Sequence, residues 1–509
     1  MLARARTFTI EGLHARAVTV EVDIRPGLPA FAIVGLADAA VREARDRVHA
    51  AVLNSGYEFP TRRITANLAP ADVPKVGPGF DLAIACGVLA ASGQIPTELL
   101  DTYALFGELS LDGEVRASHG TLAVAEATMK SGLGMLLLGP ARAREAALVE
   151  GLSIGVVESL SSAVRVLSGG APDPLPKPSR PPIPDATRRQ LDLSDVRGQP
   201  EAVRALTIAA AGAHNSLLSG PPGTGKTMLA QRLPSVLPPL EHSEAIEVMR
   251  IHSVTGKLGG GELLSERPFR APHHTITTAG LIGGARRGWV GEVVLAHNGV
   301  LFLDELSEFA RPTLDALRQP LEDGRVAIVR ARHSAVYPAR FMLVGATNPC
   351  PCGYAGERER CACSEADLAR HRRRLSGPLL DRIDLLVGME RPAIGNLCDK
   401  PATSSARARE LVIEARERQA ARLREEGVLV NAQMDARMLR RHVKLDEGGE
   451  AMLANSQERG LLSTRGQHRA LRVARTIADL APSETVKSEH LSGAFSLRPE
   501  AGLSGRRAA

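Results

Sequence analysis

The sequence predicts a protein of the α/β class, in which a parallel sheet is covered by helices. Three observations favour this class. Short apolar segments alternate with helical ones along the chain, a glycine-rich loop occupies residues 220–227, and a second apolar segment ends in two carboxylates at 304–305. At 509 residues the chain is long enough for about three domains of roughly 100–200 residues each.

Composition narrows the possible partners. The hydrophobic fraction of 44% is sufficient for ordinary cores, whereas the aromatic fraction of 3% argues against a binding surface of stacked rings. A net charge of +6 is equally compatible with a nucleic-acid partner and with a merely soluble surface. The best apolar run, Leu82–Ala91, contains a glycine and is far shorter than the ~20 residues of a membrane span. We therefore expect no membrane partner, no signal peptide and a cytoplasmic location.

The N-terminal part of the chain, residues 1–170, is predicted to form a mixed α/β domain. A stiff linker, residues 171–190, follows it, because the seven prolines of 172–184 prevent both a helix and a central strand. Alternating and helical patterns within the domain predict strands at 8–10, 18–24, 64–68 and 105–111 and helices near 41–53 and 79–91.

The central part, residues 191–400, is predicted to hold the parallel sheet, and residues 401–500 to form an all-α domain. The central strands are expected at 216–218, 300–303 and 341–344, with helices at 201–211 and from 228 onward. After residue 404 the pattern becomes helical and charged. Ser404 and Ser405 are candidate N-caps there, and Gly427 is a candidate stop.

The loop after strand 216–218 has the pattern of a phosphate-binding loop. Its small residues let backbone N–H groups approach phosphate oxygens, and the following helix adds partial positive charge. Lys226 is expected to reach the β- and γ-phosphates, and the Thr227 hydroxyl to hold Mg²⁺. The predicted ligands are therefore ATP and Mg²⁺, bound by Gly220, Pro221, Pro222, Gly223, Thr224, Gly225, Lys226 and Thr227.

Two further strand ends carry groups that phosphoryl transfer requires. Asp304 and Glu305 end strand 300–303, and we expect Asp304 to orient the metal and Glu305 to polarise the attacking water. Asn348 follows strand 341–344 and is placed to orient that water. The sequence therefore predicts hydrolysis of the bound nucleotide.

Four cysteines lie in the segment 349–375. Their thiolates are sufficient for a tetrahedral Zn²⁺ site. The spacing is Cys-x-Cys instead of the commoner Cys-x₂-Cys, and free thiols or a redox bridge remain alternatives to zinc. The candidate ligands are Cys350, Cys352, Cys361 and Cys363.

A glycine-rich stretch separates the two halves of the predicted nucleotide site. Ten glycines from Gly256 to Gly299 predict a loop too mobile to act as a packing element. His273 and His274 are neighbours and would point apart in a strand, so we expect a structural or capping role and not a metal site.

The segment 325–340 predicts two strands joined by a basic turn. Arg330, Arg332 and His333 are the candidates for sequence-independent contact with a phosphate backbone. An exposed charged hairpin without a ligand is the alternative. A solvated helix face likewise explains the basic run 370–374 about as well as a second phosphate contact does.

The order of these motifs, with Ser376–Leu385 after them, resembles the AAA+ branch that contains magnesium-chelatase motor subunits and MCM helicases. The run Phe269–Thr277 and the Pro-Cys-Pro-Cys element at 349–352 are similar, more narrowly, to the ComM/YifB family of bacterial magnesium-chelatase-like proteins. The resemblance covers nearly the whole chain. It implies an AAA+ P-loop ATPase core at 191–400 and a helical lid at 401–500.

The same resemblance implies a homo-hexameric ring. Arg382 matches an arginine finger that acts on the neighbouring subunit's ATP, although an ordinary surface ion pair with Asp381 or Asp384 explains it without the resemblance. Arg465 resembles the sensor 2 arginine, with Arg469 and Arg472 nearby as alternatives. A solvated basic helix face explains the same residues without the resemblance. In helicases of this branch the hairpin projects into the channel, and the insertion before Gly299 faces the pore.

Two N-terminal segments, 74–83 and 106–115, resemble the proteolytic domain of Lon, an α+β fold similar to ribosomal S5 domain 2. Lon-type hydrolysis requires a serine activated by a lysine. Gly79 occupies the serine position, and residues 114–129 contain no lysine. We therefore expect a scaffold or a DNA- or partner-binding collar, and no peptidase.

The expectation that follows is an ATP-dependent DNA motor, a helicase or branch-migration enzyme. It would promote the integration of incoming single strands in natural transformation and recombination, with single-stranded or branched DNA as its partner. A chelatase-like or chaperone-like remodeller of a protein partner is the alternative, because it would share every nucleotide-binding residue.

Overall fold

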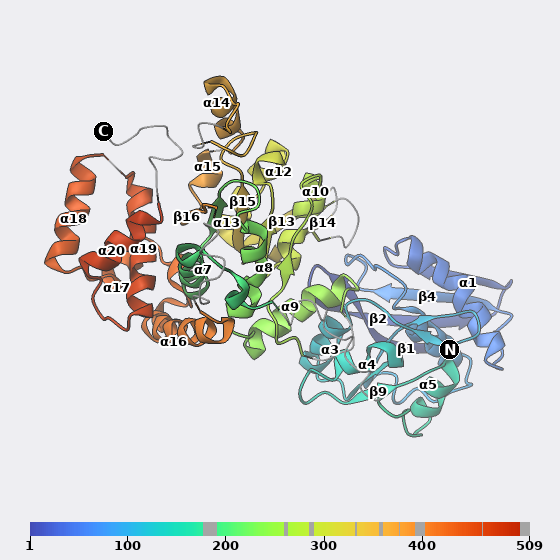
Figure 1. Ribbon diagram of the computed structural model, residues 1–509. Coiled ribbons are helices and arrows are strands. Elements are labelled where there is room, and N and C mark those ends of the chain that lie inside the picture. The colour runs from blue at the N-terminus through green and yellow to red at the C-terminus, as the bar shows by residue number, and fades with distance from the viewer. Residues whose placement is uncertain are drawn as a thin grey trace. The chain divides into compact units, whose positions relative to one another are not determined.

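The computed structural model describes residues 1–176, 191–258, 263–284, 290–330, 333–355, 360–375, 377–391, 403–460 and 462–498. These residues cluster into two compact units (Figure 1). The N-terminal unit takes in the described parts of 1–184 and 242–264. The second unit, which we call the motor unit after the family that its motifs resemble, takes in those of 185–241 and 265–509. Among the described residues, no helix is long and apolar enough to cross a membrane.

The N-terminal unit is built on a seven-stranded mixed sheet with the order β3-β4-β2-β1-β5-β8-β9. Strands β1, β2 and β4 pair antiparallel, whereas β1, β5, β8 and β9 run parallel. A small hairpin, β6 Glu108–Leu109 and β7 Val115–Arg116, stands apart from it. The sheet strands are β1 Leu2–Glu11, β2 His14–Arg25, β3 Ala30–Val34, β4 Arg63–Ala69, β5 Tyr103–Phe106, β8 Met135–Leu138 and β9 Ile154–Val156.

Six helices of the N-terminal unit are described. Every residue of α2 is buried, which explains why its sequence after Asp81 is apolar and shows no polar face. The predicted strand 8–10 extends back to Leu2, because the buried Ala3 and Ala5 alternate with the exposed Arg4 and the half-buried Arg6. The helices are α1 Ala39–Asn54, α2 Asp81–Ala91, α3 Thr121–Lys130, α4 Pro140–Ala146, α5 Leu160–Leu167 and α9 His242–Val254.

Helix α9 belongs to the N-terminal unit, although the sequence places it inside 191–400. Its Met249 is buried in a cluster with Phe8 and Phe106. Arg250 pairs with Glu126 at 2.7 Å, and the amide of Gly120 donates to the carbonyl of Ser253 at 3.1 Å. The chain thus leaves the motor after its phosphate-loop helix, contributes α9 to the N-terminal unit, and returns.

The motor unit contains a five-stranded, fully parallel sheet with the order β11-β12-β15-β10-β16. The predicted strands 216–218 and 300–303 are confirmed, and the third, predicted at 341–344, continues to Thr347. All six residues of that third strand are buried, as expected for a central parallel strand. The strands are β10 Ser216–Ser219, β11 Phe269–Arg270, β12 Val300–Leu303, β15 Met342–Thr347 and β16 Leu385–Gly388.

Short helices and one hairpin surround this sheet. The hairpin predicted at 325–340 is present as β13 Arg325–Arg330 paired antiparallel with β14 His333–Pro338. The helices are α7 Pro200–Gly212, α8 Lys226–Val236, α10 Thr278–Ile282, α11 Glu292–Leu295, α12 Arg311–Asp315, α13 Arg318–Asp323, α14 Glu365–Arg374 and α15 Gly377–Leu380, with 3-10 turns at Leu193–Asp195 and Leu306–Glu308.

The prediction that the glycine-rich stretch 256–299 is too mobile to pack is wrong for its described parts. Strand β11 is an edge strand of the motor sheet, and Val293, Val294 and Leu295 of α11 are buried. Glycine is needed there for close backbone approach, because a Cβ at Gly299 would lie 2.0 Å from the carbonyl oxygen of Pro268. Residues 259–262 and 285–289 lie outside the described residues.

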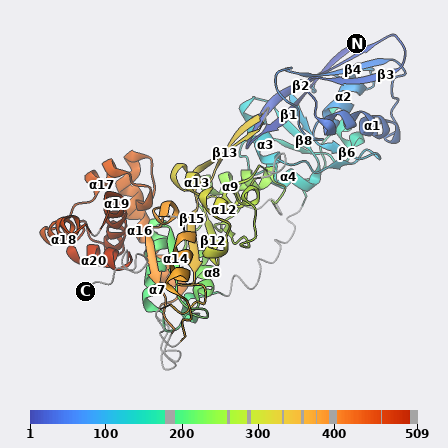
Figure 2. The same ribbon diagram turned by 90° about the horizontal axis from the view of Figure 1, so that it is seen from above.

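The C-terminal part of the motor unit is helical, as predicted, and its helices gather on one side of the sheet (Figure 1 and Figure 2). Ser404 caps the first of them by accepting from the amide of Arg407, and Gly427, at φ +69°, follows the 3-10 turn Arg424–Glu426. Ser405 lies inside the helix. The helices are α16 Ser405–Leu423, α17 Ala436–His442, α18 Glu447–Glu458, α19 Thr464–Leu480 and α20 Ser488–Ser496, with a 3-10 turn at Asn431–Gln433.

Candidate nucleotide-binding site

The glycine-rich loop connects β10 to α8, as the sequence predicts. Gly223 and Gly225 have φ angles of +80° and +87°, which favour glycine, and Gly225 is the N-cap of α8. A Cβ at Gly220 would lie 2.2 Å from the carbonyl oxygen of Met389, just after β16. The glycines therefore fix a tight turn that ends at a helix N-terminus, where an anion is favoured.

Lys226 is buried at the first position of α8. Its Nζ donates to the carbonyls of Gly220 at 2.6 Å and Pro221 at 2.9 Å, and to Oδ1 of Asn348 at 3.1 Å. Burial lowers the pKa of this amine, and the charge of Asp304 opposes that shift. The ammonium thus connects the loop to the end of β15, where the phosphates of a nucleotide would replace carbonyl oxygens as its partners.

Thr227 and Asp304 meet between α8 and β12. The Thr227 hydroxyl donates to Oδ2 of Asp304 at 2.7 Å, and Oδ1 of Asp304 accepts from the amide of Glu305 at 2.9 Å. A hydroxyl and a carboxylate are hard oxygen ligands of the kind Mg²⁺ prefers. The two residues therefore fit a magnesium ion beside the phosphate loop.

Glu305 has an unusual backbone and an unexpected neighbour. Its φ of +51° places a non-glycine residue in the left-handed region, a strain that functional sites often carry. Its side chain is 57% exposed, and Oε2 lies 3.5 Å from Nδ1 of His274. Sequence reasoning missed His274 as a site residue, because the two segments are distant in the chain and come together through the parallel pairing of β11 with β12.

The prediction that His273 and His274 point apart is wrong. The two residues lie in a turn between β11 and α10, not in a strand, and their ring centroids are 4.1 Å apart. His273 accepts locally from Thr275, whose hydroxyl is 2.9 Å from Nδ1, so a capping role is observed for His273 alone. His274 faces Glu305.

Arg382 lies in the turn between α15 and β16. Its Nη2 is 2.7 Å from Oε1 of Glu322 on α13, and its Nη1 donates to the carbonyl of Pro378. The ion pair therefore forms with Glu322 and not with the sequence neighbours that we considered. Asp381 pairs instead with Arg469, and Asp384 with the buried His214.

The three arginines of α19 have different environments. Arg465 is exposed in the first turn of the helix. Arg469 is buried and donates to the carbonyls of Leu380 and Asp381, so it holds the turn that carries Arg382. Burial lowers the pKa of Arg472, and the charge of Asp384 opposes that effect. Of the three, Arg465 is the one with an exposed side chain.

Near the tip of the basic hairpin, the structure describes the backbone of Arg330 and His333 only. Arg330 and His333 are paired in the register of β13 with β14, and nothing is described of their side chains. Arg332 lies outside the described residues. Along the basic run 370–374, Arg374 pairs with Glu308, whereas His371 is buried and its Nε2 lies 2.9 Å from the carbonyl oxygen of Asn348.

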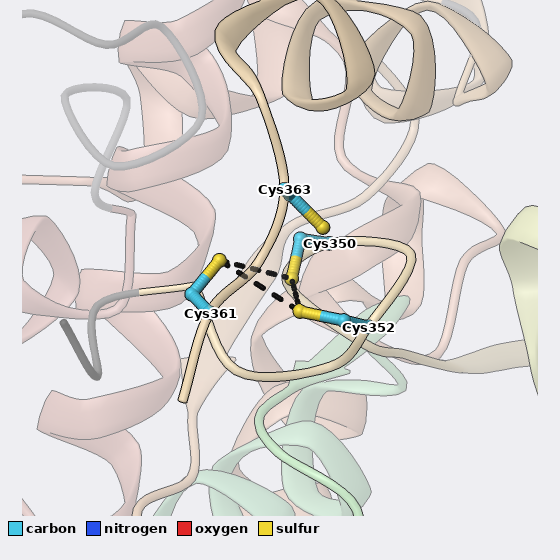
Figure 3. A group of neighbouring side chains, drawn as sticks. All are labelled: Cys350, Cys352, Cys361 and Cys363. Carbon is cyan, nitrogen blue, oxygen red and sulfur yellow. Dashed lines mark hydrogen bonds between the residues drawn. The ribbon is translucent and has the colours of Figure 1, made fainter. Parts of the chain in front are cut away.

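The four cysteines come together in space (Figure 3). Their sulfur atoms all lie within 4.8 Å of one another, and those of Cys350, Cys352 and Cys361 are 3.3 to 4.0 Å apart. A tetrahedral site with Zn–S bonds of about 2.3 Å has sulfur atoms about 3.8 Å apart. The residues fit a closed zinc site. Hydrogen bonds from the backbone at Tyr354 and from the Cys350 thiol lower the pKa of Cys352 to about 6.

The N-terminal unit has no room for a serine nucleophile at the position that the sequence singled out. A Cβ at Gly79 would lie 2.4 Å from Cε2 of Phe106, so the phenyl ring fills the space of a side chain. The buried Lys75 donates its amine hydrogen to the carbonyl of Pro70. These contacts are those of a packed core.

Comparison with known proteins identifies the family. Models described as magnesium chelatase, subunit ChlI, as subunit ChlI of Mg-chelatase and as the ChlI C-terminal domain match residues 192–397, 20–141 and 402–498. An "Uncharacterized protein YifB" of Escherichia coli is 44% identical over 96% of this chain and 95% of its own length. "Competence protein ComM" of Haemophilus influenzae is 42% identical over the same shares.

The chain belongs to the ComM/YifB family. A further relative, an uncharacterized protein of Mycobacterium tuberculosis, is 43% identical over 98% of both chains. The "Magnesium-chelatase 38 kDa subunit" of Acidiphilium rubrum is 28% identical over 30% of this chain. Membership of the ComM/YifB family places the chain among the magnesium-chelatase-like AAA+ ATPases, which use ATP and Mg²⁺.

Proposed function

We propose that this chain is an ATP-driven DNA motor. It acts as a homo-hexamer on single-stranded or branched DNA and, by unwinding or branch migration, promotes integration of incoming single strands in natural transformation and recombination. The observation that carries the proposal is the meeting of Lys226, Thr227, Asp304 and Asn348 at the carboxyl ends of β10, β12 and β15. The similarity to a protein named for competence supports the DNA substrate.

Each catalytic group has a role that its contacts support. Lys226 neutralises charge on the β- and γ-phosphates, and Thr227 and Asp304 would hold Mg²⁺, which would neutralise negative charge on the phosphate oxygens. Glu305 accepts the proton of the attacking water, and His274 holds that carboxylate in place. Asn348, bonded to Lys226, orients the water against the γ-phosphate.

The proposed ring completes the site in trans. Arg382 contacts the ATP of the next subunit and stabilises the charge that develops on the γ-phosphate. Within its own chain this guanidinium is oriented by Glu322, at 2.7 Å. Arg465, exposed at the start of α19, serves as the sensor of the lid, and Arg469 positions the turn that bears Arg382.

DNA is held by the hairpin β13–β14. Arg330, Arg332 and His333 at its tip contact phosphates of the backbone, so binding is independent of sequence and weakens with salt. The N-terminal unit, Lon-like in fold but without peptidase activity, is a scaffold or a binding collar. One Zn²⁺ per chain occupies the four-cysteine site, and the protein works in the cytoplasm.

The match to magnesium-chelatase subunits supports a second candidate, a chelatase-like or chaperone-like remodeller of a protein partner. It shares every nucleotide-binding residue with the DNA motor. The two candidates differ in whether DNA is the substrate.

A strand-exchange assay tests the DNA motor directly. Purified protein with ATP is added to a labelled three-strand branched substrate, and the expected result is movement of the branch point. Glu305→Gln is the matched control, because it keeps the protein and the bound nucleotide but stops turnover. Equal branch movement with both proteins, or none with either, contradicts the proposal.

A further inference from the structure

The cysteine cluster is connected directly to the nucleotide site. Cys350 is buried and stands two residues after Asn348, at the end of β15. At the other end of the loop, Cys363 precedes Ser364, the N-cap of α14, whose hydroxyl accepts from the amide of Asp367. The cluster therefore joins the two ends of the loop that leads from Asn348 to α14.

This loop contacts the nucleotide site at two separate places. Nε2 of His371 on α14 lies within hydrogen-bond distance of the carbonyl oxygen of Asn348, at 2.9 Å. The helix that follows the cysteine cluster thus contacts the residue that precedes the cluster. Gly353 packs against Pro222 of the phosphate loop, since a Cβ at Gly353 would lie 2.6 Å from Cδ of Pro222. A shift of the loop would therefore move both Asn348 and Pro222.

The cluster has the donor set of a structural metal site. All four ligands are sulfur, which favours Zn²⁺ over Mg²⁺, and four protein ligands leave no open position for water or substrate. Such a metal fixes the backbone and takes no part in hydrolysis. Its effect on the reaction has to pass through the residues that the loop touches.

We propose that Zn²⁺ bound by Cys350, Cys352, Cys361 and Cys363 holds this loop against Pro222 and Asn348, so that metal occupancy controls ATP binding and hydrolysis. The inference rests on the ATPase and zinc sites proposed above and adds the coupling between them. DNA is left out of its test, so a failure of the DNA assignment does not affect the result.

The test uses the full-length chain and measures bound zinc by elemental analysis, affinity for a fluorescent ATP analogue, and ATP turnover without DNA. Wild-type protein is expected to hold about one zinc per chain. Cys361→Ser and Cys363→Ser are expected to lose the metal and to lower turnover about tenfold or more, the usual range for residues that support a site indirectly. Cys86→Ala, at a buried cysteine of α2, is the matched control and keeps both properties.

A second variant changes the contact between Gly353 and Pro222 and leaves the four cysteines in place. Gly353→Ala is expected to keep its zinc and to bind ATP more weakly, because the added methyl displaces Pro222 and because φ at this position is +86°. If the cysteine variants do not fold, wild-type protein stripped with a thiol-specific mercurial and restored with dithiothreitol and zinc gives the same information. Wild-type protein without zinc, with a disulfide in its place, or with unchanged turnover after stripping overturns the proposal.

Discussion

Both units of the molecule bury a lysine against backbone carbonyls, and the two lysines have different neighbours. Lys75 of the N-terminal unit donates to the carbonyl of Pro70; burial lowers its pKa, and the charge of Asp72 opposes that shift. Elsewhere in the same unit, the buried Asp81 is paired with Arg47 at 2.7 Å. Burial raises the pKa of Asp81 to about 6, and the hydrogen bond from Arg47 opposes that shift. Both charged groups are buried in the N-terminal unit, and their hydrogen-bond partners are a backbone carbonyl for Lys75 and a guanidinium for Asp81.

Lys226 of the motor unit is surrounded by groups that can exchange partners. Its carbonyl contacts lie in a glycine-rich turn, its third contact is the amide of Asn348, and a hydroxyl–carboxylate pair suited to Mg²⁺ lies beside it. Burial of a lysine is therefore a poor indicator of function by itself. The chemistry of the atoms around it distinguishes the two sites.

The largest expected difference between the units comes from replacing each lysine. Lys226→Ala should abolish ATP binding, a loss of at least about a hundredfold in turnover, because the phosphates lose their cation. Lys75→Met should cost about 1–3 kcal/mol of stability, since the carbonyl of Pro70 loses its buried donor, while turnover of the folded protein stays unchanged. Nucleotide titration measures the loss of ATP binding, and thermal unfolding measures the loss of stability. An equal loss of turnover in the two variants would contradict the different roles assigned to the two lysines.

Glu305→Gln should bind ATP with unchanged affinity and lower turnover about a hundredfold or more, because the amide cannot accept the proton of water. His274→Ala should lower kcat by a smaller factor, about tenfold, since the carboxylate keeps its chemistry but loses its neighbour at 3.5 Å. Steady-state kinetics separates the two effects. A His274→Ala protein with a changed KM and an unchanged kcat would assign that histidine to binding.

Doping Arg382→Ala subunits into wild-type protein should inhibit ATP turnover out of proportion to their fraction, because each one disables the site of its neighbour. Glu322→Gln is the companion variant and should lower turnover moderately, since it removes the partner that orients the guanidinium. ATP turnover across a mixing series is the measurement. A strictly proportional decline would place the arginine outside its neighbour's site.

Replacing Arg330 and Arg332 together by alanine should reduce the salt dependence of DNA binding by about two counterions, because each arginine contributes one phosphate contact. Basal ATP turnover without DNA should remain that of the wild type. Fluorescence anisotropy at several salt concentrations measures the slope. Unchanged affinity and slope would exclude the hairpin tip as the DNA contact.

The smallest expected effect on turnover is in the N-terminal unit. Gly79→Ser restores the nucleophile that a Lon-type site requires, but its side chain meets the ring of Phe106, and overpacking of this kind costs about 1–3 kcal/mol. No peptidase activity should appear on an unfolded casein substrate, and ATP turnover should stay normal. Proteolysis by the variant would show that the unit differs from an active protease by one side chain only.

Three of the five strands of the motor sheet could be predicted from the sequence, at 216–218, 300–303 and 341–344, because a phosphate-binding loop and an apolar strand before two carboxylates are local patterns. The pairs Thr227–Asp304 and Lys226–Asn348 follow once β15 lies between β10 and β12 in one parallel sheet, so that all three strands end at the same edge. Strand β1 was predicted too short, since alanines are the buried residues of its alternation and carry a weak hydrophobic signal.

Other features depend on contacts between segments that are distant in the chain, which a local sequence pattern does not predict. The proximity of His274 to Glu305 requires the short edge strand β11, two residues long, inside a stretch whose glycines resemble a loop. The partner of Arg382 is on α13, far from it in the chain. The amphipathic pattern of helix α9 predicts a helix with one buried face but does not tell which unit that face packs against. The buried neighbours of α9 in the structure place it in the N-terminal unit.

The rate of ATP turnover with and without DNA tests the central claim most directly. Single-stranded and branched DNA should each raise the rate of the wild-type protein several-fold at low salt, and Lys226→Ala should show no turnover under any condition. The same wild-type rate with either DNA as without it, in protein that binds and hydrolyses ATP, would contradict the assignment of a DNA motor.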